Sequence, residues 1–171
     1  MMTLIIDLAR LLIFPAVMAF AASSDFFTMT ISNRISLILV AGFVALAVGT
    51  GMPVGEMFDH AGAGGLVLAV TFTFFLFGWV GGGDAKLAAA TALWLGWAHL
   101  IDYLLYASIL GGVLTLALLE FRKFTMPRLL IGKQWAERLH KPNGGVPYGI
   151  ALAIAALVIY PSTIWMPVLG N

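Results

Sequence analysis

Long apolar stretches follow one another along the chain, separated by short segments that hold glycine, proline or charged residues. A helix that crosses a bilayer needs about 20 consecutive, mostly apolar residues. The apolar stretches lie at roughly residues 4–24, 35–52, 62–80, 85–97, 100–119 and 147–168. This pattern predicts an all-α fold, a polytopic transmembrane helical bundle of about six spans.

The stretch at 85–97 is the shortest of the six. Its 13 residues would rise about 20 Å as a helix, whereas the hydrocarbon core is about 30 Å thick. We therefore expect it to thin the bilayer, to extend through Gly82 and Gly83, or to be no full span.

Composition supports a membrane protein. Of the 171 residues, 61% are hydrophobic and 10% are charged, too few charges to cover a surface in water. A soluble enzyme, a nucleic-acid binder and a disordered tail are excluded as leading interpretations. Six spans leave about 50 residues for loops, so we expect a single integral-membrane domain over residues 1–171, in contact with the lipid bilayer and with no nucleic-acid partner. The absence of cysteine excludes disulfides, thiol catalysis and thiolate metal sites.

The first apolar stretch has two interpretations. Residues 19–21 could mimic the cleavage site of a signal peptide. However, the region before the uninterrupted apolar run at 11–22 includes Asp7 beside its only cation, Arg10, which does not suit a signal peptide. We expect a retained first span, with Asp7 and Arg10 paired on one helix face.

The longest polar segment, at about 120–146, is strongly basic. Its cations are Arg122, Lys123, Arg128, Lys133, Arg138 and Lys141. Positive charge concentrates on the cytoplasmic side of membrane proteins, so this loop should be cytoplasmic. Apolar residues interleave with the basic ones, which suits either a short helix at the headgroup level or a solvated loop without fixed structure.

Charge counting alone does not decide between six spans and five. With six spans, all Lys and Arg residues except Arg10 are cytoplasmic, and with five spans one fewer is. In both cases two spans separate Asp25 from Asp84, so the two aspartates lie on the same side of the membrane.

Asp25 and Asp84 are the strongest candidates for chemistry. Three glycines precede Asp84, and they leave room for another chain beside the carboxylate. Two carboxylates brought together titrate as a unit, and such a pair suits acid–base hydrolysis of a peptide bond. The alternatives are a helix-end carboxylate for Asp25 and a helix N-cap for Asp84.

The other ionisable residues indicate no site. We expect Glu56, Asp59 and His60 to be solvated in a loop that contains glycine and proline. His99 and Asp102 are three residues apart, but two ligands are too few for a metal. We expect no metal and no cofactor.

Three elements resemble a known family. Residues 81–87, Gly-Gly-Gly-Asp-Ala-Lys-Leu, match the Gly-x-Gly-Asp-x-Lys-Leu signature of type IV prepilin peptidases, which are intramembrane aspartic peptidases of bacteria. Residues 31–35, Ile-Ser-Asn-Arg-Ile, resemble the family's Ile-Pro-Asn-Arg element, with Ser32 where proline is common. Residues 146–151, Val-Pro-Tyr-Gly-Ile-Ala, resemble the start of its last span.

The resemblance implies a function. Asp25 and Asp84 would be the catalytic pair, and the substrate would be a prepilin or pseudopilin whose short basic leader is removed at the cytoplasmic face of the bacterial inner membrane. That location selects the six-span orientation. The chain is similar to the short form associated with tight-adherence (Flp) pili, because it has no cysteine and no room for the region linked to N-methylation. We expect a peptidase without methyltransferase activity.

Other interpretations stay open. One is a preflagellin-type peptidase with the same chemistry. A second is a small transporter that uses Asp25 and Asp84 as proton or cation sites, and a third is a scaffold for pilus assembly. Lys86 would serve as a cytoplasmic anchor or orient a carboxylate or substrate, whereas Asn33 and Arg34 would fix their loop. Neither the cognate prepilin nor the oligomeric state follows from the sequence.

Overall fold

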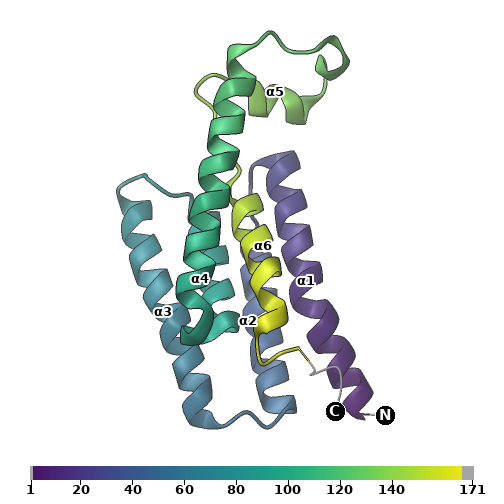
Figure 1. Cartoon of the computed structure of the whole chain (residues 1–171), viewed down its shortest axis with the longest axis vertical. Helices are drawn as coiled ribbons and strands as arrows, with labels where there is room; N and C mark the ends of the chain where they lie inside the picture. Colours follow the sequence, from purple (N-terminus) through teal and green to yellow (C-terminus); the bar gives the residue numbers. More distant parts are fainter. Residues whose placement is uncertain (1, 167–171) are drawn as a thin grey trace.

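The computed structural model describes residues 2–166, and within that range every regular element is a helix, with no strand (Figure 1). The helices are α1 (Met2–Thr28), α2 (Asn33–Gly49), α3 (Val54–Leu76), α4 (Gly82–Lys123), α5 (Gln134–His140) and α6 (Tyr148–Ile159), with 3₁₀ turns η1 (Arg128–Leu130) and η2 (Tyr160–Ser162). The predicted all-α fold is confirmed.

The lengths and apolarity of the helices suit a membrane. In the described part of the chain, three helices are long and apolar enough to cross a bilayer: Leu4–Thr28, Val54–Leu76 and Gly82–Lys123. Two shorter apolar helices, Asn33–Gly49 and Tyr148–Ser162, lie among them. Many large apolar side chains are exposed on the outside of the bundle, which is where lipid tails would replace water. The chain therefore folds as a helical membrane bundle.

The 42-residue helix α4 is broken at Gly96. Gly96 has φ +65° and ψ −174°, and a Cβ there would lie 2.9 Å from Cε1 of His60, so only glycine fits without strain. The chain folds back at this point (Figure 1). Ala88 of the first half therefore lines the same cavity as Leu104 of the second. The segments predicted at 85–97 and 100–119 are thus two helical segments joined at one glycine, and the first of them extends back to Gly82.

The break leaves backbone carbonyls without helical partners, and two side chains satisfy them. The His60 Nδ1 lies 2.8 Å from the Leu93 oxygen, so this nitrogen carries the proton, and the Trp165 indole donates to the Trp94 oxygen at 2.7 Å. The expectation that His60 is solvated in a loop is wrong. Helix α3 begins directly after Pro53, so His60 lies within this helix and not in a loop. Its side chain faces the interior, and only 7% of the residue is exposed.

The core of the bundle is aromatic. The rings of Phe14 and Tyr160 stack with centroids 4.5 Å apart, and Trp94 lies 5.1 Å from both Phe14 and Trp165. These side chains come from α1, α4, η2 and the residues after η2, so the cluster joins the first and last helices to the first half of α4. Aromatic pairs of this kind contribute about 0.5–1.5 kcal/mol beyond the area they bury.

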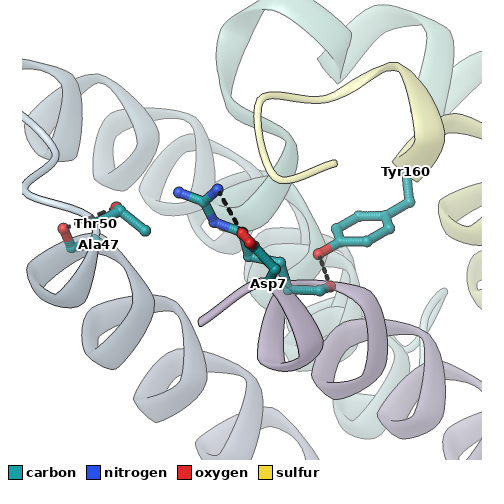
Figure 2. Close-up of polar contacts among 5 residues, drawn as sticks. Asp7, Ala47, Thr50 and Tyr160 are labelled. Carbon is teal, nitrogen blue, oxygen red and sulfur yellow. Dashed lines mark hydrogen bonds and ion pairs between the residues drawn. The ribbon is translucent and has the colours of Figure 1, made fainter. Parts of the chain in front are cut away.

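One hydrogen bond ties the amino-terminal half of α1 to η2, which directly follows α6. The Tyr160 hydroxyl donates to the Arg10 carbonyl at 2.6 Å (Figure 2). The predicted pairing of Asp7 with Arg10 is confirmed, with 3.6 Å between Oδ1 and Nη1. Of the predicted last span, residues 147–168, the final two lie outside the described residues.

The basic segment is folded. Helix α5 lies beyond the carboxyl end of α1 (Figure 1), where the Trp135 ring is 5.2 Å from that of Phe26, and Arg138 donates to the Phe27 carbonyl at 3.0 Å. Arg122 bonds the carbonyls of Leu139 and Gly145 at 2.8 and 2.7 Å. Of the two interpretations of this segment, the short helix holds and the loop without fixed structure does not.

Candidate active site

The structure brings Asp25 and Asp84 to one cavity. Asp25 lies in the last turn of α1 and is 4% exposed, whereas Asp84 lies in the first turn of α4 and is half-buried. Both line a cavity of about 710 Å³. The shared cavity agrees with the expectation that the two aspartates lie on the same side of the membrane, which itself stays a prediction.

Asp25 is held by the start of α6. A carboxylate at the carboxyl end of a helix faces the negative end of the helix dipole, which disfavours its charge. The N–H of Gly149 compensates, because it donates to Oδ2 of Asp25 at 2.7 Å. A buried carboxylate oxygen therefore has a fixed partner from the far end of the chain.

The glycines before Asp84 allow close packing. The N-cap of α4 is Gly81, so the alternative of Asp84 as N-cap does not hold. A Cβ on Gly83 would lie 3.0 Å from Cβ and 3.1 Å from the carbonyl oxygen of Ile31, and one on Gly81 would lie 3.0 Å from Oδ2 of Asp84. Gly83 thus makes room for the loop between α1 and α2 of this same chain, and the expected room for another chain beside the carboxylate stays a prediction.

The walls of the cavity are mostly apolar. They come from the carboxyl end of α3, the loop that follows it, both halves of α4 and the start of α6. Besides the aspartates, the lining includes Thr71, Trp79, Leu104, Ala107, Ser108, Tyr148 and Leu152. The arrangement offers two carboxyl groups at one place on an apolar wall, which suits a hydrophobic peptide segment with a reactive bond at its end.

The element at residues 31–35 forms a helix start. Ser32 is the N-cap of α2, and its hydroxyl accepts from the Arg34 N–H at 3.3 Å, so serine makes this turn without proline. Asn33 accepts a 2.8 Å hydrogen bond from Nζ of Lys86. Lys86 is exposed and contacts Asn33 rather than either carboxylate, which favours the anchor role over orientation of a carboxylate.

Sequence reasoning assigned no role to Gly149 or Tyr148, although it noted the element at 146–151. Tyr148 packs against Gly111 so closely that a Cβ there would collide with its ring. This contact fixes the start of α6 against the second half of α4. Within residues 2–166, no group of three or more His, Asp or Glu side chains is placed to hold a metal ion.

The fold and this cavity together define a helical membrane protein with two aspartates, one buried and one half-buried, on one cavity. The sequence model of the type IV leader peptidase family matches residues 12–116, well over half of the chain and including both aspartates. The chain belongs to the type IV leader peptidase family and is a membrane protease of that kind. The element at 146–151 lies outside the matched segment. No curated protein and no solved structure matches the chain.

Proposed function

We propose that this protein is an aspartic endopeptidase that removes the short basic leader from Flp-type prepilins or pseudopilins, with Asp25 and Asp84 as its catalytic pair. The observation that carries the proposal is the shared cavity of about 710 Å³. Among the described residues, no other acidic side chain lines it. Membership of the leader peptidase family supplies the class of reaction.

The chemistry needs only the two carboxyl groups and water. One carboxylate takes a proton from water as the oxygen attacks the carbonyl carbon of the scissile bond, and the protonated partner donates to the carbonyl oxygen. The tetrahedral intermediate then collapses: one of its hydroxyl groups returns a proton to the partner carboxylate, the C–N bond breaks, and the leaving nitrogen takes the proton that the first carboxylate removed from water. No cofactor enters this sequence of steps.

We assign the site to the cytoplasmic face of the bacterial inner membrane. The basic segment of α5 packs against the carboxyl end of α1, the end that carries Asp25. Positive charge marks the cytoplasmic side, which supports this orientation. The apolar helix of the prepilin would stay in the bilayer against the apolar wall, with its leader in the cytoplasm and the cleaved bond just after the glycine of the leader.

We further propose that the enzyme does not methylate its product. The chain has no cysteine, and four residues, 29–32, connect α1 to α2. Mass spectrometry of the mature pilin checks this. An unmodified amino terminus is expected, and a terminus heavier by one methyl group would contradict the proposal.

One set of substitutions tests the catalytic pair. Asp25→Asn and Asp84→Asn keep the shape of each side chain and remove its titratable group, so both variants should accumulate in the membrane while prepilin stays full-length on a gel. Asp102→Asn, an exposed site on the same helix as Asp84, is the matched control and should process normally. If mature pilin accumulates at the control rate with either of the first two variants, the assignment of the catalytic pair is contradicted, and a transporter or scaffold is favoured.

A further inference from the structure

The two aspartates are connected through a single side chain in the loop between α1 and α2. Ile31 contacts Gly83, the residue before Asp84, because a Cβ on Gly83 would lie 3.0 Å from Cβ of Ile31. Ile31 also contacts Gly149, where an added Cβ would lie 2.5 Å from its Cδ1. Ile31 is therefore packed between two glycines: Gly83 of α4 lies against its Cβ, and Gly149 of α6 lies against its Cδ1.

Gly149 also reaches the other carboxylate directly. Its N–H donates to Oδ2 of Asp25 at 2.7 Å, and a Cβ at this position would lie only 2.8 Å from the same oxygen. Because Gly149 is the second residue of α6, its N–H has no acceptor within the helix and is free to serve Asp25. Any larger residue at position 149 would displace the Asp25 carboxylate, the Ile31 side chain or both.

We propose that Gly149 is a positioning residue for Asp25, and that the Gly83–Ile31–Gly149 contact sets the separation between the Asp25 and Asp84 carboxyl groups. This inference rests on the proposed function, because it assigns a role within the reaction of those carboxyl groups. The N–H fixes Oδ2 of Asp25, which leaves the other oxygen available for the reaction. The absence of a side chain lets α6 approach closely enough for that bond to form.

The chain contains a matched control for this role. Gly55 is the second residue of α3 and follows an N-cap proline by two positions, as Gly149 does in α6. A Cβ at Gly55 would meet nothing within 4 Å. The two glycines thus hold the same position in their helices, and they differ in that only Gly149 contacts Asp25 and Ile31.

The sharpest test removes the N–H of residue 149 without adding a side chain. Incorporating glycolic acid at position 149 by nonsense suppression, in full-length enzyme made in nanodiscs, replaces the amide with an ester. A hydrogen bond to a charged group is worth about 1.5–3 kcal/mol, so kcat for prepilin cleavage should fall about 10- to 100-fold with KM little changed. The same ester at position 55 should leave kcat unchanged. An unchanged kcat with the ester at 149, or a change in KM alone, would overturn the proposal.

A second experiment separates positioning from packing. In Gly149→Ala, the new Cβ would collide with both Ile31 and Asp25. Ile31→Val removes the Cδ1 atom of Ile31, but the new Cβ would still lie 2.8 Å from Oδ2 of Asp25. With kcat expressed per folded molecule, the double variant Ile31→Val/Gly149→Ala should stay at least about tenfold below Ile31→Val alone, whereas Gly55→Ala should match the unsubstituted enzyme. Recovery of kcat in the double variant would mean that the glycine serves only to accommodate Ile31.

Failure of this inference can be told from failure of the proposed function. If Asp84→Asn still processes prepilin, the proposed function fails whatever position 149 does. If Asp84→Asn is inactive and the ester at 149 keeps full kcat, the catalytic pair stands and only the positioning role is lost.

Discussion

Nζ of Lys86 donates a 2.8 Å hydrogen bond to Oδ1 of Asn33, and this contact joins the start of α4 to the start of α2. It links two of the three sequence elements by which the chain resembles its family, across 53 residues. Both partners are exposed, and neither lines the cavity that holds Asp25 and Asp84. The contact therefore stands beside the candidate active site rather than inside it.

Lys86→Met should have a small effect. An exposed polar pair contributes about 0–1 kcal/mol, so the midpoint of thermal unfolding in detergent should change little and prepilin processing should stay within about fivefold of normal. Lys123→Met, which removes an exposed pair with Glu120 at the far end of α4, is the control. A loss of processing as complete as that of Asp84→Asn would assign Lys86 to the reaction.

Gly96→Ala should destabilise the bundle. A backbone with positive φ and ψ near 180° is essentially confined to glycine and costs another residue about 1–3 kcal/mol, and the new Cβ would lie 2.9 Å from the His60 ring. The unfolding free energy should fall by about 2 kcal/mol or more, and cleavage should decline because the first half of α4 carries Asp84. Gly112→Ala, where an added Cβ meets nothing within 4 Å, should be neutral or slightly stabilising. Equal stability of the two variants would contradict the account of the break.

Arg122→Met should loosen the segment that leads into α6. The Arg122 side chain bonds the carbonyls of Leu139 and Gly145, and without it both carbonyls lose their charged donor. Hydrogen exchange measured by mass spectrometry should become faster in residues 139–146, with Lys123→Met as the control. Unchanged exchange there would show that aromatic packing of α5 on α1 holds the segment alone.

The orientation of the chain has its own test. A reporter that is active only in the periplasm, fused after Gly132 in the basic segment, should stay silent. A strong signal would contradict the assignment of the Asp25–Asp84 pair to the cytoplasmic face.

Much of the fold could be predicted because the length of each apolar run can be read directly from the local sequence. The helices follow the apolar stretches, and two intervening spans were enough to place Asp25 and Asp84 on one side. The helix ends were less well predicted, since α1 continues to Thr28 and so includes Asp25 in its last turn. The glycines before Asp84 predicted a close approach but not its partner, Ile31.

The features that were missed depend on contacts between distant residues. A boundary between the apolar stretches at 85–97 and 100–119 was predicted, but its exact position at Gly96 was not, because glycine is too common in membrane helices to mark a break. His60 has acidic neighbours in the sequence, and its burial comes from the Leu93 carbonyl and the approach of Gly96. The bond from Gly149 to Asp25 spans 124 residues, and no local pattern predicts it.

The central claim is that Asp25 and Asp84 act as one catalytic unit on a prepilin. Cleavage rates of purified Asp25→Asn, Asp84→Asn and the double variant, in one membrane mimic with one prepilin, test it directly. Because residues that act as a unit are strongly non-additive, each single variant should lose nearly as much activity as the double variant. Losses that multiply independently, or a single variant that still cleaves at the normal rate, would contradict the claim.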